Sequence, residues 1–154
     1  FSQQSIVESN FYTDFKKALT LFNSKAYTSA QMEFEKIKTY APKTSTIYVE
    51  SSYYEAICAI KLNQAKADDK VLDFVKNNPT SSKKNKAFLN VGNHYFSNRK
   101  PAYALKWYIK VDRSLLNKND RNTLDFKMGY GLLVANNLSD AKEKFFSLMK
   151  DEIY

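Results

Sequence analysis

The chain has 154 residues and a net charge of +8, from 24 Lys and Arg against 16 Asp and Glu. Its length suits a single domain with a sizeable core, but three glycines are too few for a hairpin-rich β fold or a nucleotide-binding loop. One histidine and one cysteine exclude a zinc site of the usual His/Cys kind and a disulfide framework within the chain.

Apolar residues recur at helical spacing along the whole chain and predict eight helices, arranged as four successive pairs. The first helix of each pair is predicted at residues 9–24, 46–62, 84–98 and 121–136. The second helix of each pair is predicted at residues 28–40, 66–77, 101–116 and 139–150. No apolar run approaches the roughly 18 residues that a membrane-spanning helix needs.

Two local signals support these helix boundaries. Thr28 and Gln31 have the spacing of a capping box, which predicts that their side chains open the second helix of the first pair. Pro101 is predicted to lie in the first turn of another second helix, where its missing N–H costs nothing.

Small and apolar residues recur with a period of 37 residues, which indicates an internal repeat. The clearest column consists of Ala30, Ala67, Ala104 and Ala141. Apolar residues follow four positions later, at Phe34, Val71, Tyr108 and Phe145. Twelve positions before the alanines stand Ala18, Glu55, Gly92 and Gly129. Small residues allow two helices to approach closely, so Glu55 is the exception, and Ala56 can take its place by a slip of one residue.

These columns resemble the tetratricopeptide repeat, whose motif runs W-x2-L-G-x2-Y, then A-x3-F-x2-A and a trailing proline. The third unit matches the motif best, at Phe88, Val91, Gly92, Tyr95, Ala104, Tyr108 and Val111. The resemblance implies an all-α fold, a right-handed α-solenoid of four helix-turn-helix repeats at residues 8–42, 45–79, 82–116 and 119–152.

The family period is 34, so each unit here carries three extra residues. In this respect the chain is similar to tetratricopeptide proteins of the Gram-negative cell envelope, and residues 74–81 are similar to their F-x-x-x-x-P-x-S junction. An exported protein, periplasmic or associated with the outer membrane, is therefore expected, and a cytoplasmic location is the alternative. The chain ends directly after a second helix, so we expect either further repeats in a longer protein or self-association through the open C-terminal repeat.

The resemblance implies a protein-interaction scaffold that binds a peptide or helix segment from another protein in a concave groove. Carried over from the family, the groove residues are Tyr12, Phe15, Phe22, Lys86, Leu89, Asn93, Phe96, Phe126 and Tyr130. For Phe15, Phe22 and Phe126 the alternative is packing against a neighbouring repeat. Some family members clamp a C-terminal carboxylate at five columns, of which only Asn90 and Lys127 match here, so that clamp is not predicted.

The positive charge is concentrated in residues 80–116, which hold eight basic residues and one acidic residue. A convex basic patch is predicted on the second helix of the third pair and its turn, at Arg99, Lys100, Lys106, Lys110 and Arg113. It is either a solvated face or a docking site for an acidic protein surface or anionic lipid. A nucleic-acid-binding repeat protein is the alternative to the scaffold, although the chain has no stacking platform interleaved with its basic residues.

Catalysis is not expected, because the sequence offers no candidate triad, metal cluster or glycine-rich loop. We therefore predict no enzyme activity and no cofactor. His94, the single histidine, lies beside the packing positions Gly92 and Tyr95 and is expected to be structural.

Overall fold

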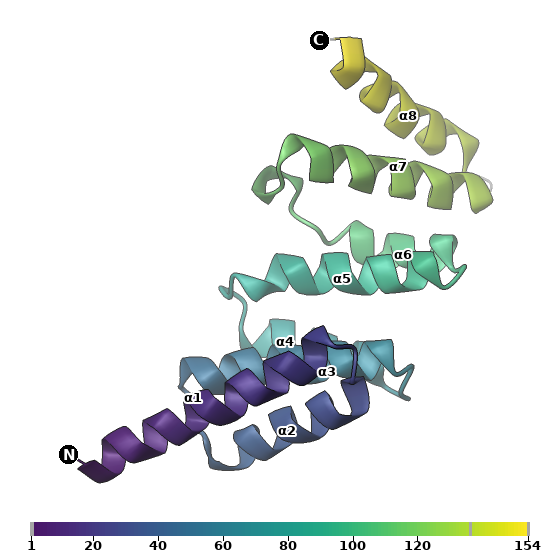
Figure 1. The fold of residues 1–154 in the computed structure, drawn as a ribbon. Coiled ribbons are helices and arrows are strands. Elements are labelled where there is room, and N and C mark those ends of the chain that lie inside the picture. Colours follow the sequence, from purple (N-terminus) through teal and green to yellow (C-terminus); the bar gives the residue numbers. More distant parts are fainter. Residues whose placement is uncertain (1, 136, 154) are drawn as a thin grey trace. The chain divides into compact units, whose positions relative to one another are not determined.

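The computed structural model describes residues 2–135 and 137–153, and the side chains of residues 10–135 and 137–150. Every regular element in these residues is helical, which confirms the all-α class (Figure 1). The elements are α1 Ser2–Asn23, α2 Tyr27–Tyr40, α3 Thr46–Lys61, α4 Ala67–Asn77, α5 Lys83–Ser97, α6 Pro101–Tyr108, the 3-10 helix η1 Arg113–Leu115, α7 Lys118–Val134 and α8 Leu138–Ile153. None of the described helices is long and apolar enough to cross a bilayer.

The chain divides into two compact units, Phe1–Ser81 and Ser82–Tyr154, which we call the N-terminal and C-terminal units and describe separately. In the N-terminal unit α1 packs against α2 and α3, α2 against α3, and α3 against α4. In the C-terminal unit α5 packs against α6, α6 against α7, and α7 against α8. The two helices of each predicted pair therefore contact each other.

Most predicted helix boundaries agree with the structure to within two residues, and four differ by more. Helix α7 begins at Lys118 rather than at residue 121, and α8 ends at Ile153 rather than at residue 150. Helix α1 begins at Ser2 rather than at residue 9, and further along it Phe11 stacks on Tyr40 of α2 at a centroid distance of 5.0 Å. Tyr40 also donates a hydrogen bond to Asp14. Helix α6 ends at Tyr108 rather than at residue 116.

After Tyr108 the chain changes to i→i−3 turns, in which the N–H groups of Lys110 and Val111 donate to Trp107 and Tyr108 at 3.0 and 3.1 Å. A distant side chain then takes the backbone groups of Asp112 that would continue the helix. The N–H of Asp112 donates to Oδ1 of Asn85 at 2.7 Å, and Nδ2 of Asn85 donates to the carbonyl of Asp112 at 3.1 Å. In a continuing helix that N–H would bond to Tyr108 instead. The carboxylate of Asp112 then caps η1 by accepting a hydrogen bond from the backbone N–H of Ser114 at 3.0 Å.

Small residues allow the paired helices to lie close together. A Cβ atom on Gly92 would lie 2.5 Å from the ring of Tyr108, and one on Gly129 would lie 2.9 Å from the ring of Phe145. Ala18 is fully buried in the same cluster as Phe34. In three of the four pairs, therefore, a small residue of the first helix faces an aromatic residue of the second.

The second pair keeps a small residue at this point through a slip of one residue. A backbone hydrogen bond of 2.8–3.0 Å closes each turn between paired helices, from an N–H group to the carbonyl five residues earlier. The N–H donors and carbonyl acceptors are Ala26 and Leu21, Gln64 and Ala59, Lys100 and Tyr95, and Asn137 and Leu132. Three residues before the acceptors stand Ala18, Ala56, Gly92 and Gly129. Ala56, 4% exposed, thus holds the small position, which confirms the predicted slip and leaves Glu55 beside it.

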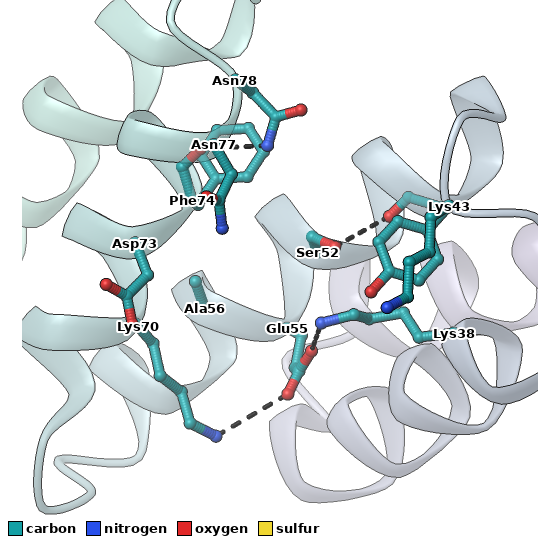
Figure 2. A pocket seen from close by; sticks show the side chains of 11 residues that line it. Lys38, Lys43, Ser52, Glu55, Ala56, Lys70, Asp73, Phe74, Asn77 and Asn78 are labelled. Atoms are coloured by element: carbon teal, nitrogen blue, oxygen red, sulfur yellow. Dashed lines mark hydrogen bonds and ion pairs between the residues drawn. The ribbon is translucent and has the colours of Figure 1, made fainter.

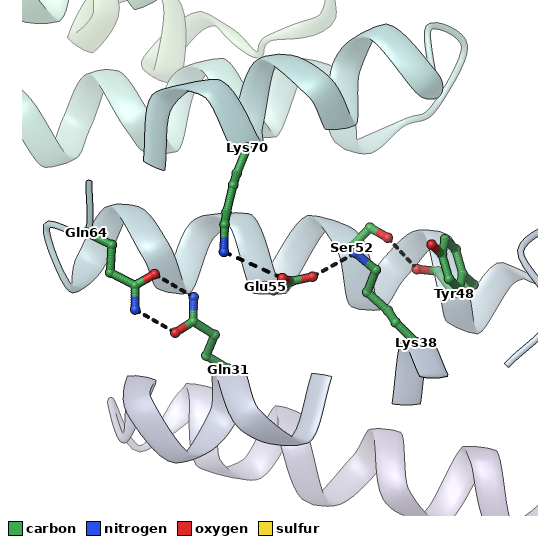
Figure 3. Close-up of polar contacts among 7 residues, drawn as sticks. All are labelled: Gln31, Lys38, Tyr48, Ser52, Glu55, Gln64 and Lys70. Carbon is green, nitrogen blue, oxygen red and sulfur yellow. Dashed lines mark hydrogen bonds and ion pairs between the residues drawn. The ribbon is translucent and has the colours of Figure 1, made fainter. Parts of the chain in front are cut away.

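The capping box predicted for α2 is wrong. Helix α2 begins at Tyr27, and the preceding residue, Ala26, has no side chain that could cap it. Gln31 is buried and exchanges two hydrogen bonds with Gln64, at 2.8 and 2.7 Å (Figure 3). The Gln31 side chain therefore pairs with a distant amide, whereas the local pattern predicted that it would cap the start of α2. Pro101 lies in the first turn of α6, as predicted.

The core of the N-terminal unit surrounds the single cysteine. Cys58 is fully buried in a cluster with Ala18, Ala30, Phe34 and Ile37. The Phe34 ring stacks on Tyr54 of α3 at 5.3 Å, so α2 and α3 share this core. Burial raises the pKa of the Cys58 thiol to about 12, and the nearby Glu55 carboxylate adds to the rise.

We predict that Gly92→Ala lowers the free energy of unfolding by about 1–3 kcal/mol, because the new methyl group overlaps the Tyr108 ring. A decrease in the free energy of unfolding would be informative, because alanine in a helix ordinarily stabilises it by up to about 1 kcal/mol relative to glycine. Urea denaturation measures the change, with exposed Ser97→Ala on the same helix as the control. In a Tyr108→Val background, which lacks the ring, the same Gly92→Ala change should lower the free energy of unfolding by less than it does in the original chain. A Gly92→Ala chain as stable as the original would contradict the close approach.

We predict that Cys58 reacts slowly with a thiol reagent at pH 8 in the folded chain and rapidly in urea. The fold favours the protonated thiol, so its contribution to the free energy of unfolding is complete below the unfolded pKa of about 9 and is lost as the pH rises towards 12. Cys58→Ala is the control: it should not react, and its stability should fall less steeply above pH 9. Rapid labelling of the native chain would show that the core is open.

Candidate functional site

Side chains of α5 and α7 meet at one surface of the C-terminal unit. The rings of Phe96 and Tyr130 lie with their centroids 5.7 Å apart at an interplanar angle of 67°. Nζ of Lys127 donates a hydrogen bond to Oδ1 of Asn93 at 3.0 Å and lies over the Phe96 ring, 5.4 Å from its centroid. We call this surface, with the neighbouring Phe126, the α5–α7 face.

The α7 side of this face is apolar and exposed. The fractional exposures are 53% for Phe126, 44% for Tyr130, 44% for Leu133 and 51% for Val134. Single exposed apolar residues are common, but a run of four on one helix indicates an interaction surface. Phe126 also approaches Phe145 of α8, with centroids 6.2 Å apart.

The position of Lys127 follows from the close approach of α5 and α6. Because Gly92 has no side chain, the Tyr108 ring lies against α5, and its hydroxyl donates to Oδ1 of Asn93 at 2.7 Å. Burial raises the pKa of Tyr108, which keeps the hydroxyl protonated as a donor. The same Asn93 oxygen accepts the bond from Lys127. Asn93 is thus held by the core of the unit and in turn orients the lysine.

Lys127 is partly buried without a carboxylate partner among the described side chains. Desolvation lowers the pKa of its ammonium group. Within the described part of the chain, one neutral oxygen and one aromatic face compensate for the lost hydration. A partly desolvated cation interacts more strongly with an incoming anion than a fully hydrated one. The α5–α7 face can therefore bind a carboxylate next to apolar side chains.

The remaining predicted groove residues lie elsewhere or are packed. On α5, Lys86 is exposed and Leu89 is partly buried. Tyr12 of α1 is 56% exposed, and Nζ of Lys16 lies 4.8 Å from its ring centroid.

Phe15 and Phe22 of α1 are partly buried against the core of the N-terminal unit. The Phe15 ring lies 5.9 Å from Phe34 and 6.2 Å from Tyr54. The Phe22 ring lies 5.5 Å from Tyr27 and 5.0 Å from Tyr54. Packing between α1, α2 and α3 is sufficient to explain both rings.

The basic patch does not form the predicted helical stripe, because α6 ends before two of its members. Lys106 lies on α6, whereas Lys110 follows the helix and Arg113 lies in η1. Arg99 has a positive φ of 63° in the turn before α6. Three of the lysines lie over aromatic rings, with Nζ-to-centroid distances of 6.0 Å for Lys100 on Tyr95, 5.5 Å for Lys106 on Tyr103 and 6.0 Å for Lys110 on Phe88.

Arg113 serves the interior of the unit. It donates a hydrogen bond to the carboxylate of Asp125, which is 1% exposed, and Nζ of Lys144 lies 3.6 Å from the other oxygen of that carboxylate. These ion pairs join η1, α7 and α8. Arg113 is therefore committed to a buried carboxylate, which removes it from the set available to an acidic partner.

The residues that sequence reasoning considered for chemistry are buried or isolated. His94 is 8% exposed, and its Nδ1 lies 3.3 Å from Nδ2 of Asn98. Within the described part of the chain, no three His, Cys, Asp or Glu side chains are grouped closely enough to hold a metal ion. From the sequence, Lys127 could be named only as a position of the carboxylate clamp. The pattern gave no sign that Lys127 and Tyr108 bond to the same Asn93 oxygen.

We predict that Arg113→Gln lowers the free energy of unfolding by about 1–3 kcal/mol, because it leaves the buried Asp125 with one weaker partner. The matched control is Lys106→Gln, which removes an equal charge from an exposed position and should change stability by no more than about 0.5 kcal/mol. Thermal and urea denaturation of the two variants measure the difference. Equal losses would show that Arg113 acts only through the net charge.

Similarity to known proteins does not identify this site. No family model matches the chain, and no curated protein or solved structure matches it either.

Proposed function

We propose that the chain is a non-catalytic protein-interaction scaffold whose α5–α7 face binds an acidic peptide or helix segment of another protein. The observation that carries the proposal is Lys127, a partly buried ammonium group without a described carboxylate partner, beside exposed aromatic side chains. Its charge and the neighbouring rings provide the two kinds of contact that an amphipathic acidic segment needs.

A structural role alone does not account for Lys127. Partial burial disfavours its charged form, as the lowered pKa indicates, so the ammonium group reduces the stability of the fold near neutral pH. Groups that cost stability are concentrated at functional sites. A carboxylate from a partner would supply the missing countercharge and offset this cost.

The apolar part of the face suits a helical or extended partner. Phe126 and Tyr130 are four residues apart on α7 and so project from the same side of the helix, with Leu133 one turn further on. Aromatic side chains provide most of the binding energy at many protein interfaces. We expect the partner to place two or three apolar side chains here and an Asp or Glu beside Lys127.

The larger arrangement is part of the proposal. A right-handed solenoid of four tetratricopeptide-like units is supported by the 37-residue columns, the contacts within each helix pair and the similar turn-closing bonds. A location in the cell envelope, periplasmic or at the outer membrane, rests on the sequence resemblance and stays a prediction. Self-association through the last repeat also stays a prediction.

Binding to nucleic acid or to an anionic surface is the second candidate function. It is favoured by the charge of the C-terminal unit, whose 14 Lys and Arg outnumber its seven Asp and Glu. With Arg113 committed to Asp125, the exposed basic patch consists of Arg99, Lys100, Lys106 and Lys110. Binding of this kind would weaken steeply with salt.

We predict that selection of a random 16-residue peptide library on the chain enriches peptides that combine Asp or Glu with aromatic residues or Leu. Lys127→Met should weaken the selected peptides by about tenfold or more, since a charge-assisted hydrogen bond is lost. The same variant should be as stable as the original chain or more stable, because it removes a desolvated charge. Fluorescence anisotropy and urea denaturation measure the two effects.

The matched control is Lys106→Met, which removes another lysine that lies over an aromatic ring. It should leave peptide affinity unchanged. Peptides without an acidic preference, or equal affinity for the Lys127→Met chain, would contradict the proposal. Micromolar binding of mixed-sequence DNA or RNA that falls steeply with salt and depends on Lys106 would support the second candidate instead.

A further inference from the structure

A second site lies in the N-terminal unit, where a hollow of about 440 Å³ opens between α2, α3 and α4 (Figure 2). Its volume is in the range of sites that hold small molecules. Ala56 and Phe74, each 4% exposed, provide apolar surface in its lining. Five charged side chains also line the hollow: Lys38, Lys43, Glu55, Lys70 and Asp73.

The inner charges form one connected group around Glu55, whose side chain is 13% exposed. Nζ of Lys38 donates to one carboxylate oxygen at 2.7 Å, and Nζ of Lys70 lies 3.7 Å from the other. Figure 3 shows the two lysines reaching Glu55 from different helices. Two ammonium groups and one carboxylate leave this group with a net charge of +1, so the interior of the hollow favours an anion.

The outer charges are one of each sign. Lys43 and Asp73 are exposed, and neither makes an ion pair within the part of the chain that the structure describes. Figure 2 places them on opposite sides of the hollow. Lys43 lies on the side of Lys38, and Asp73 lies on the side of Lys70. The complementary ligand therefore carries a negative group at one end and a positive group at the other.

Neutral groups complete the lining. Nδ2 of Asn78 donates to the carbonyl of Phe74 at 3.0 Å, which leaves its carbonyl oxygen as an acceptor. The Ser52 hydroxyl donates to the carbonyl of Tyr48 at 2.9 Å, which leaves its oxygen as an acceptor as well. Both oxygens can accept from the N–H groups of a ligand.

We propose that this hollow binds a small zwitterion of the dipeptide class, whose ammonium and carboxylate groups lie at opposite ends of the molecule. The carboxylate of the ligand faces Lys38 and Lys43, and its ammonium group faces Asp73. The apolar floor of Ala56 and Phe74 receives the aliphatic part of the ligand. The site is separate from the α5–α7 face, and the inference does not depend on the proposed peptide binding.

Ligand-detected NMR and calorimetry with a set of unblocked dipeptides test the proposal. At least one zwitterion should bind with a dissociation constant below about 1 mM. Its N-acetylated and C-amidated forms should each bind about tenfold more weakly, since each lacks one of the two charges. The proposal is overturned if no unblocked compound binds, or if blocking either end leaves the affinity unchanged.

Variants separate this site from other charged surfaces. Lys43→Gln and Asp73→Asn should each weaken the zwitterion by about tenfold, with little change in stability because neither side chain is in a described ion pair. The controls are Lys36→Gln and Asp69→Asn, which remove exposed charges from α2 and α4 outside the hollow. Lys127→Met should bind the zwitterion normally. If the two control variants weaken zwitterion binding as much, the effect comes from net charge alone, and the assignment is overturned.

Discussion

The contact between the Tyr108 ring and the bare backbone of Gly92 determines much of the C-terminal unit. It sets how closely α6 lies on α5, and it brings the Tyr108 hydroxyl to Asn93, the residue that follows Gly92. Asn93 then orients Lys127 of the next helix. A single packing contact is thereby connected, through two hydrogen bonds to one oxygen, with the exposed face on which the proposed function depends.

The sequence was sufficient to predict the helices because their signals are local. Small residues such as Ala18 and Gly92, and the apolar residues that follow them, mark buried faces at a spacing that only helices satisfy. The one-residue slip at Ala56 could also be anticipated, since Glu55 does not suit a close helix contact. What the sequence could not show were pairings between distant polar side chains. Asn85 bonds to the backbone of Asp112 after α6, 27 residues away, and Gln31 bonds to Gln64 rather than to its own helix end.

The contacts divide the basic side chains into those that pair with a carboxylate of the chain and those that are exposed without one among the described residues. Arg113 and Lys144 pair with the buried Asp125. Lys38 and Lys70 share the single carboxylate of Glu55, so one positive charge of that group is left over. Composition counts these cations together with exposed ones, and only the structure separates the two classes. The candidate groove residues differ in the same way, because the Phe15 and Phe22 rings of α1 pack inward while the Phe126 and Tyr130 rings of α7 remain exposed.

Because Asn93 bonds to both Tyr108 and Lys127, little of the chain has to move when a partner binds. Its carbonyl oxygen has two lone pairs, one for the Tyr108 hydroxyl and one for the Lys127 ammonium group. An incoming carboxylate can draw Lys127 away without breaking the bond that holds Tyr108 in place. Binding would then require of the chain only the rotation of one lysine side chain, a movement of nanoseconds, while α5 and α6 stay packed together.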